Sequence, residues 1–157
     1  MPSVLDTRDA VAAPEDLRLE LTRVIKAPRA RVFDAWTRPE MIRQWFGADG
    51  RTAAEVSTDA KVGGAYSIAM ESCAEEGRHS KATGRYTKVD PYDLLQFTWE
   101  GSWVPGEESL VTIHLRDVEG GTEIKLIHDR FNSKESRDGH NKGWMGILDH
   151  LVEVLAA

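Results

Sequence analysis

The sequence contains a single cysteine, Cys73, so the chain can form neither an internal disulfide nor a cluster of thiolate metal ligands. It has no apolar run near the roughly 18 residues that a membrane-spanning helix needs. Its first residues include Asp6, Asp9, Glu15 and Asp16 and show no basic stretch followed by an apolar one, as a signal peptide would. These absences predict a cytoplasmic protein that is not inserted in a membrane.

The motifs of several common enzyme classes are also missing. The chain has no Gly-x-Ser-x-Gly elbow, no His-Glu-x-x-His motif, no Gly-x-Gly-x-x-Gly motif and no glycine-rich phosphate loop. Its five histidines show no spacing typical of metal ligands, so we expect neither a metal nor a cofactor. The net charge of −6 opposes binding to nucleic acid. The sequence does not exclude a reaction that needs only one acid–base group in a pocket without water.

The 157 residues, of which 41% are hydrophobic, are enough for one domain with its own core. Residues 1–16 are small and acidic and show no periodicity, so we expect them to form a mobile N-terminal tail. The rest of the sequence shows no internal repeat and no linker. We therefore expect a single domain over residues 17–157, present as a monomer or a homodimer.

Residues 140–157 show the spacing of a helix that covers a core. Apolar side chains recur at steps of three and four: Trp144, Ile147, Leu148, Leu151, Val152 and Leu155. We expect this helix to begin between Ser133 and His140 and to need an apolar surface roughly 27 Å long. Three glycines leave one side of this helix without side chains: Gly139, Gly143 and Gly146. This arrangement is compatible either with close packing on a sheet or with room for a ligand.

The first part of the ordered chain predicts a strand followed by two short helices. Residues 17–26 alternate between apolar and polar side chains, as a half-buried strand does. A helix over 28–36 should follow, with a second helix directly after it. We expect Thr37 to cap this second helix, Pro39 to lie in its first turn and Gly47 to end it.

The middle of the chain predicts six further strands. Turn-forming pairs recur at regular intervals: Gly63-Gly64, Glu76-Gly77, Asp90-Pro91, Pro105-Gly106 and Gly120-Gly121. They separate strand candidates at 52–58, 65–72, 79–89, 93–101, 108–117 and 122–130. Four of these strands have one apolar face, formed by Tyr66, Ile68 and Met70; by Leu95, Phe97 and Trp99; by Val111, Ile113 and Leu115; and by Ile124, Leu126 and His128. The regular spacing favours successive antiparallel hairpins.

This order of elements resembles the START-like (SRPBCC, Bet v 1-like) helix-grip superfamily. Within it, the chain is similar to the family named for the activator of Hsp90 ATPase homologue 1 (AHSA1-like). The resemblance covers roughly residues 17–155. It rests on Arg23–Pro28, Val32–Thr37, Pro39-Glu40 with Trp45-Phe46-Gly47, Gly63-Gly64, Gly121-Thr122 with His128, and Gly143-Trp144 with Leu148 and Leu151.

The resemblance implies an α+β fold in which a curved antiparallel sheet wraps around a long C-terminal helix, with two short helices after the first strand. It also implies that the chain binds a small hydrophobic or lipid-like ligand in a cavity between the sheet and that helix. One alternative is an enzyme like the polyketide cyclases and dehydratases, with one acid–base residue in the pocket. Another is a stress-related or Hsp90 co-chaperone-like interaction role. The sequence shows no counterpart of the separate N-terminal domain of the co-chaperones, so Hsp90 is the less favoured partner.

Under this interpretation, the ligand-binding residues are large side chains that face the concave side of the sheet. The candidates are Trp36, Trp45, Phe46, Tyr66, Met70, Phe97, Trp99, His128, Trp144 and Leu148. Ligand pockets are mostly apolar and enclose roughly 300–1,000 Å³. The competing interpretation is that these side chains fill a solid hydrophobic core.

His128 shares the parity of Leu126, so it should point inward, whereas His114 should face solvent. A buried histidine most often donates one ring N–H to a carbonyl group. It can instead anchor a polar group of a ligand or act as a general base, because its unperturbed pKa is about 6.5. No catalytic residue is assigned. We expect most charged residues on the strands to face water, and the sequence leaves open which of them points inward: Arg23, Glu55, Arg85 or Glu100.

Overall fold

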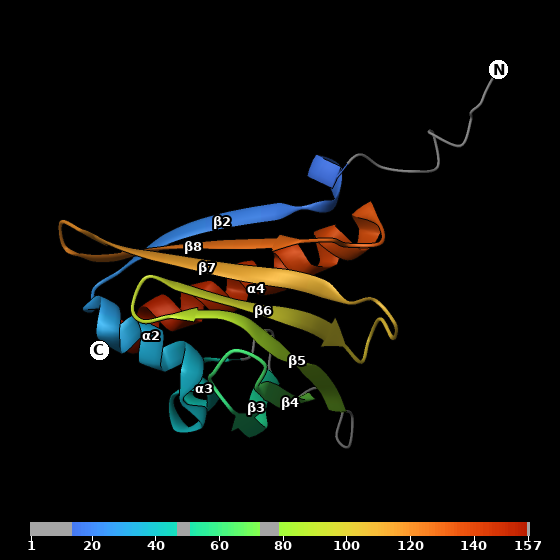
Figure 1. Cartoon of the computed structure of the whole chain (residues 1–157), viewed down its shortest axis with the longest axis horizontal. Helices are drawn as coiled ribbons and strands as arrows, with labels where there is room; N and C mark the ends of the chain where they lie inside the picture. Colours follow the sequence, from blue (N-terminus) through green and yellow to red (C-terminus); the bar gives the residue numbers. More distant parts are fainter. Residues whose placement is uncertain (1–13, 47–50, 73–78, 157) are drawn as a thin grey trace.

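The computed structural model describes residues 14–46, 51–72 and 79–156. It shows a curved antiparallel sheet wrapped around a long C-terminal helix, with two short helices after the first strand (Figure 1). This is the expected α+β helix-grip architecture. The predictions for residues 1–13, Gly47, Cys73 and the Glu76-Gly77 turn lie outside the described residues and stay predictions.

The elements follow the predicted order closely. They are η1 (Pro14–Leu17), β2 (Leu19–Ile25), α2 (Arg29–Thr37), α3 (Pro39–Trp45), β3 (Arg51–Thr58), β4 (Ala65–Ser72), β5 (His79–Asp90), β6 (Leu94–Gly101), β7 (Ser109–Val118), β8 (Gly121–Asp129) and α4 (Lys134–Ala156). The sheet order is β2-β8-β7-β6-β5-β4-β3, with every neighbouring pair antiparallel. We expected Leu17 to begin the first strand, but it belongs to the short helix η1.

The predicted alternation along the strands is confirmed. On β6 and β8 every second side chain is buried, and the residues between them are half-buried. Neighbouring strand positions point to opposite faces, so one parity meets the helices while the other meets water. The predicted inward sets are all buried, from Tyr66, Ile68 and Met70 on β4 to Ile124, Leu126 and His128 on β8. His114, of the opposite parity on β7, is exposed as expected.

The two short helices differ from the prediction at the residue that joins them. We expected Thr37 to cap the second helix, but it is the last residue of α2, and its hydroxyl donates to the Phe33 carbonyl over 3.1 Å. Arg38 is the N-cap of α3 and makes no side-chain capping bond, whereas Pro39 lies in the first turn as predicted. Thr37 is buried, and the carbonyl one turn earlier supplies the acceptor that a buried hydroxyl needs.

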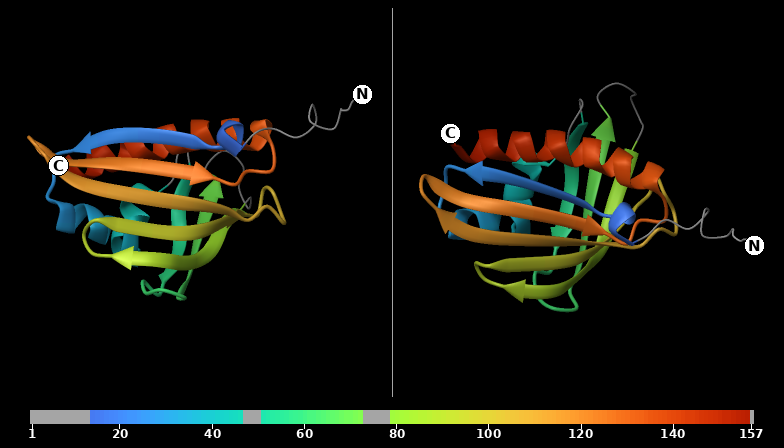
Figure 2. Two further views of the ribbon diagram at one scale, coloured as in Figure 1. Left: turned by 45° about the horizontal axis from the view of Figure 1, so that its top comes forward. Right: turned by 90° about the horizontal axis from the view of Figure 1, so that it is seen from above.

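The C-terminal helix α4 begins at Lys134, near the early limit of the predicted interval, and lies across the concave face of the sheet (Figure 2). Its 23 residues correspond to a length of about 35 Å. Arg23 on β2 donates to the Asp149 carboxylate over 2.9 Å, which ties the helix to the first strand. Of the helices described, none is long and apolar enough to cross a lipid bilayer. The apolar stripe is buried as predicted, at Trp144, Ile147, Leu148, Leu151 and Leu155.

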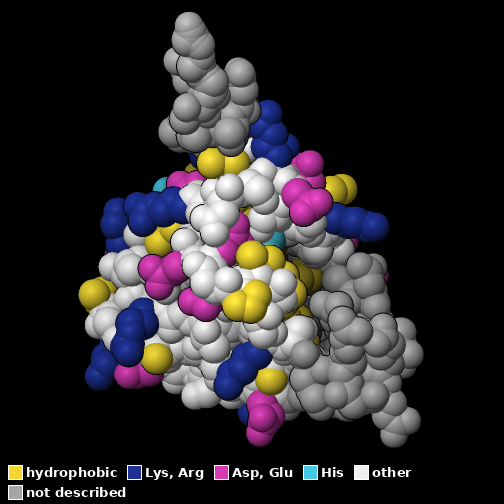
Figure 3. Space-filling view, turned by 90° about the vertical axis from the view of Figure 1, so that its right-hand side faces the viewer, with side chains coloured by type: hydrophobic (Ala, Val, Ile, Leu, Met, Phe, Trp, Pro, Cys, Tyr) yellow, Lys and Arg dark blue, Asp and Glu magenta, His cyan; other side chains and the backbone are white. Residues whose placement is uncertain are grey.

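The loop between β6 and β7 holds the beginning of α4 in place. Glu107, only 3% exposed, accepts hydrogen bonds from the Asn132 backbone N–H and from the Ser136 hydroxyl, each over 2.6 Å. In the same loop, Trp103 Nε1 donates to His140 Nε2 over 3.3 Å. Figure 3 faces this end of the molecule and shows apolar side chains gathered beside a histidine. The start of the helix is therefore fixed by contacts with a loop that is distant in sequence.

Candidate functional site

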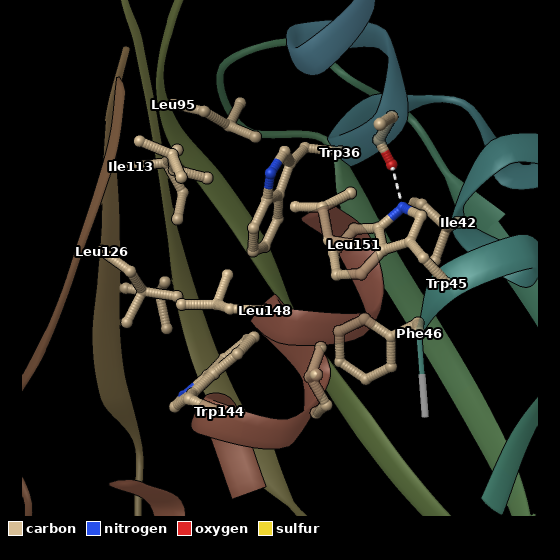
Figure 4. Close-up of a cluster of buried hydrophobic side chains, with 14 of the residues drawn as sticks. Trp36, Ile42, Trp45, Phe46, Leu95, Ile113, Leu126, Trp144, Leu148 and Leu151 are labelled. Atoms are coloured by element: carbon tan, nitrogen blue, oxygen red, sulfur yellow. Dashed lines mark hydrogen bonds between the residues drawn. The ribbon is translucent and has the colours of Figure 1, made fainter. Parts of the chain in front are cut away.

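A small cavity lies beneath α3, between the two short helices and the part of the sheet formed by β3 to β6. Its volume is about 20 Å³, enough for roughly one water molecule. Figure 4 shows Trp36, Trp45 and Phe46 directed into the interior beside residues of α4. The lining is dominated by aromatic side chains and consists of Trp36, Ile42, Trp45, Phe46, Thr58, Tyr66, Ile68, Tyr86, Phe97 and Trp99.

The structure brings six of the ten predicted ligand-binding residues to this cavity: Trp36, Trp45, Phe46, Tyr66, Phe97 and Trp99. The other four are buried elsewhere in the core: Met70, His128, Trp144 and Leu148. Sequence reasoning missed Ile42, Thr58, Ile68 and Tyr86. The parity of β4 contains the signal for Ile68, since it lies between Tyr66 and Met70 on the same face, whereas no pattern in the sequence indicates Thr58.

This cavity is smaller than the pocket that we expected and lies in a different place. We predicted a cavity between the sheet and the C-terminal helix, but α4 contributes no residue to the lining of this cavity. Trp144 fills this region instead, with its ring centroid 5.1 Å from that of Trp99 and 6.0 Å from that of Trp36. Large rings from three elements pack against one another at tilted angles and fill the gap that a curved sheet leaves beneath a helix.

Two tryptophans that line the cavity each carry a polar group that lacks the hydrogen bond that burial demands. Nε1 of Trp36 and Nε1 of Trp99 are buried, and neither donates to any described residue. Leaving such a donor unpaired costs about 1–3 kcal/mol.

The neighbouring donors on the same wall are all engaged. Trp45 Nε1 donates to the Ala35 carbonyl over 2.8 Å, drawn as the dashed line in Figure 4. The Tyr66 hydroxyl donates to the Thr98 carbonyl over 2.6 Å, and the Thr58 hydroxyl donates to the Thr37 carbonyl over 2.8 Å. The two free indole N–H groups therefore stand out from the other donors of the lining.

The cavity is electrically neutral. None of its lining residues carries a charged side chain. Burial raises the pKa of the Tyr66 phenol well above its ordinary value, and the adjacent Tyr86 adds to this shift. Burial likewise raises the pKa of Tyr86, with a further contribution from the Asp59 carboxylate. Both phenols therefore stay protonated at neutral pH, and the site offers no ionic partner to a ligand.

His128 lies next to the cavity wall and takes part in a chain of hydrogen bonds that runs from Trp144 to the Trp99 carbonyl. Trp144 Nε1 donates to His128 Nδ1 over 2.9 Å, so in the neutral ring the proton is on Nε2. That nitrogen lies 2.6 Å from the Ser109 hydroxyl oxygen and donates to it, and the Ser109 hydroxyl donates to the Trp99 carbonyl over 3.1 Å. Both ring nitrogens are thus occupied within the protein.

The chain of bonds around His128 is arranged differently from a serine–histidine catalytic pair. A serine nucleophile needs an imidazole nitrogen that accepts its proton, whereas here Nε2 already carries one. Burial lowers the pKa of His128 well below its usual value, and the positive charge of a protonated His140 would lower it further. In the described form, His128 holds β7, β8 and α4 together and offers no free base.

The charged residues on the strands face away from the cavity. Glu55 and Arg85 are exposed. Arg23 pairs with Asp149, and the Glu100 carboxylate accepts the Gly106 backbone N–H over 3.2 Å. Within the described parts of the chain, no three His, Cys, Asp or Glu side chains are close enough to hold a metal ion.

Comparison with known proteins identifies relatives of this chain. The family described as Activator of Hsp90 ATPase homolog 1-like protein matches residues 26–156. No functionally curated protein matches significantly.

Similar solved structures come from several bacteria. A Rhodobacter sphaeroides protein has 28% identity and a TM-score of 0.79, covering 90% of this chain and 93% of its own. An AHSA1 protein from Silicibacter pomeroyi has 25% identity and a TM-score of 0.75, and the match covers 88% of this chain and 97% of that protein. A Chromobacterium violaceum protein has 24% identity and a TM-score of 0.79, and the match covers 89% of this chain and 98% of that protein. This match supports the fold.

Proposed function

We propose that this chain, which belongs to the activator of Hsp90 ATPase homolog 1-like family, binds a small apolar molecule in the aromatic cavity beneath α3. The observation that carries the proposal is the lining of this cavity, which comes from α2, α3 and four strands, is dominated by aromatic side chains and contains no charged side chain. Sites that bind small molecules are typically concave and are lined mainly by apolar and aromatic side chains. The apolar lining supplies the burial energy of the bound molecule.

Binding requires the cavity to widen, because about 20 Å³ cannot hold an organic molecule. We propose that α3 is the element that moves. It has only seven residues, and it contributes Ile42 and Trp45 to the cavity lining. Its last residue is held to α4 by one hydrogen bond, from His150 Nδ1 to the Trp45 carbonyl over 3.0 Å. Elements that move on ligand binding are drawn from the less stable parts of a fold, where local opening occurs.

The alternatives suggested by the sequence stay predictions. A cyclase- or dehydratase-like activity would need a free acid–base group, and both nitrogens of His128 are engaged. An Hsp90-related or stress-related role would use the outer surface, and no contact among the described residues favours it. Neither alternative has an observation as specific as the uncharged, aromatic-lined cavity.

The proposal is tested by thermal unfolding in the presence of a library of one- and two-ring apolar compounds. A compound at about 100 times its Kd adds about 2.7 kcal/mol, which should raise the Tm by several degrees in a domain of this size. Tryptophan fluorescence gives a second readout, since Trp36, Trp45 and Trp99 line the site.

A cavity-filling variant connects any such effect to this site. Ile42→Phe adds volume to the wall and should abolish the stabilisation, whereas Met145→Phe changes an exposed side chain of α4 and should not. Circular dichroism establishes that both variants are folded. If no compound raises the Tm of the wild-type chain, or if the Ile42→Phe chain responds equally, the proposed function is wrong.

A further inference from the structure

We infer that Trp103 and His140 form a pH-sensitive latch, which holds the loop between β6 and β7 against the beginning of α4 while His140 is neutral and releases it when His140 gains a proton. The loop, residues 102–108, lies at the end of the molecule that faces the viewer in Figure 3. The inference stands on contacts of this loop with α4, so the latch does not depend on the proposed function.

The hydrogen bonds of His140 define the neutral form of its ring. Nδ1 lies 2.8 Å from the Ser136 carbonyl oxygen, which can only accept, so Nδ1 carries the proton. Nε2 is therefore the acceptor of the neutral ring, and it receives the indole N–H of Trp103 over 3.3 Å. Because an indole nitrogen can only donate, this bond exists only as long as Nε2 carries no proton.

Protonation of His140 would turn the acceptor of this bond into a second donor. Two N–H groups would then face each other, and histidine is the side chain whose charge changes between about pH 8 and pH 5. The attraction of a cation for an indole face does not compensate, because Trp103 directs its N–H edge at the imidazole and ring edges carry positive partial charge. Trp103 is 41% exposed, so after release its N–H can donate to water.

The groups around His140 leave this switch to the Trp103 bond. The Glu107 oxygens accept from Asn132 and Ser136, and none of the described carboxylates forms an ion pair with His140. His128, with its ring centroid 5.2 Å away, is buried and has both nitrogens engaged, so the proton would stay on His140. The titratable and charged groups near the imidazole are His128 on β8, Glu100 on β6, Glu107 in the loop, and Arg137, Asp138 and Lys142 on α4.

The two ends of the loop are held independently of the latch. The Ser102 backbone N–H donates to the Lys81 carbonyl over 2.8 Å, and Glu107 accepts from the start of α4. Between these ends the Trp103 ring lies against the backbone of Gly101, where a Cβ atom built on the glycine would come within 2.3 Å of the ring. Release would therefore move the Trp103 side chain while both ends of the loop stay attached.

The consequence of release is exposure of Trp99. Its ring centroid lies 6.1 Å from that of Trp103, and Trp99 itself is only 4% exposed. Trp99 is also one of the residues that line the cavity. Where the proposed function holds, a fall in pH would thus open an approach to the cavity from this end of the molecule.

The test follows the Trp103 ring by NMR in the full chain between pH 8 and pH 5, with circular dichroism to establish that the chain stays folded. In the closed form the ring protons of Trp103 should show nuclear Overhauser contacts to the α protons of Gly101. These contacts should disappear with the same midpoint as the titration of the His140 ring protons. The ratio of closed to open loop should fall about tenfold, the order of effect when one hydrogen bond is lost.

Variants assign the effect to the latch. His140→Gln carries no charge but has a carboxamide oxygen that can still accept from Trp103, so the contacts should persist at every pH. Gly101→Ala places a Cβ atom against the ring and should displace Trp103 at every pH, with both partners of the bond still present. His114→Gln changes an exposed histidine of β7 and should keep the wild-type response.

The outcomes decide the inference separately from the proposed function. If Trp103 keeps its Gly101 contacts in a folded chain whose His140 is protonated, or if the chain unfolds before His140 gains its proton, the latch does not exist. If the His140→Gln chain loses the contacts at the wild-type midpoint, another group operates the loop and the inference is wrong. A chain that releases Trp103 as expected but is stabilised by no compound of the library contradicts the proposed function alone.

Discussion

The indole nitrogen of Trp144 on α4 donates to Nδ1 of His128 on β8 over 2.9 Å, and this one bond determines the chemical state of the histidine. Because Nδ1 accepts, the proton of the neutral ring stays on Nε2, where the Ser109 oxygen receives it. In a protonated ring Nδ1 would also carry a proton, and this N–H would face the N–H of the Trp144 indole, so that two donors would meet. The pair therefore holds His128 neutral while it joins the terminal helix to the sheet.

The neutral state of His128 makes the stability of the fold depend on pH. Burial lowers the pKa of His128 in the folded chain well below its value of about 6.5 in the unfolded chain. Below about pH 6.5 the unfolded chain therefore binds a proton that the folded chain does not. The free energy of unfolding should fall as the pH drops through this range, by up to about 1.4 kcal/mol per pH unit from this group. Urea unfolding at a series of pH values measures the slope.

A pair of histidine variants assigns this slope to its source. His128→Gln lowers the stability at neutral pH but should flatten the dependence between about pH 6.5 and pH 5. His114→Gln changes an exposed histidine of the neighbouring strand β7 and should keep the wild-type slope. An equal slope in the His128→Gln chain would show that groups other than His128 cause the pH dependence.

Glu107 should be a major contributor to stability although it lies in a loop. Its carboxylate accepts from the Asn132 backbone N–H and from the Ser136 hydroxyl at the start of α4. Glu107→Ala leaves both donors without their acceptor and should cost about 2–4 kcal/mol in urea unfolding. Glu108→Ala is the matched control, because its side chain is exposed and should change the stability by less than about 0.5 kcal/mol. Equal effects of the two variants would contradict this role.

Gly139 on α4 should be replaceable with a gain in stability. A Cβ atom built at this position meets no other atom within 4 Å, so the glycine is not required for close packing on the sheet. Gly139→Ala should stabilise the fold by about 1 kcal/mol, because alanine loses less backbone entropy on forming a helix. Gly64→Ala is the contrasting variant, since its Cβ would overlap the Asp59 carbonyl, and it should destabilise. Thermal unfolding of both variants gives the answer, and a loss of stability in Gly139→Ala would indicate a hinge in the helix.

The link between His150 and the Trp45 carbonyl should control how readily α3 opens. His150→Ala removes the donor and should cost less than about 1 kcal/mol in overall stability. The amide hydrogen of Phe46, which bonds to the Ile42 carbonyl at the end of α3, should exchange with solvent several-fold faster. Glu153→Ala on the exposed side of α4 provides the control. An unchanged exchange rate at Phe46 would show that α3 is held by its packing and not by this bond.

The sequence by itself determined the secondary structure, because side-chain periodicity is a local property. The period of two along β4, β6, β7 and β8 indicated which residues are buried, and the steps of three and four over 144–155 indicated the face of α4. The inward position of His128 followed from the same rule. Six of the cavity residues followed as well, since large aromatic side chains on inward positions have few alternatives to burial.

The tertiary structure alone decided how those buried residues share the interior. Trp144 fills the space beneath α4, and the remaining cavity lies under α3, because ring shapes from distant segments determine where packing fails to close. The burial of Glu107 depends on one donor in α4, Ser136, and on a second donor just before that helix, Asn132. Both lie far along the chain, so the sequence around Glu107 contains no sign of its burial. Which indole N–H groups lack an acceptor likewise depends on contacts between β6 and α2 and their neighbours, which local periodicity does not encode.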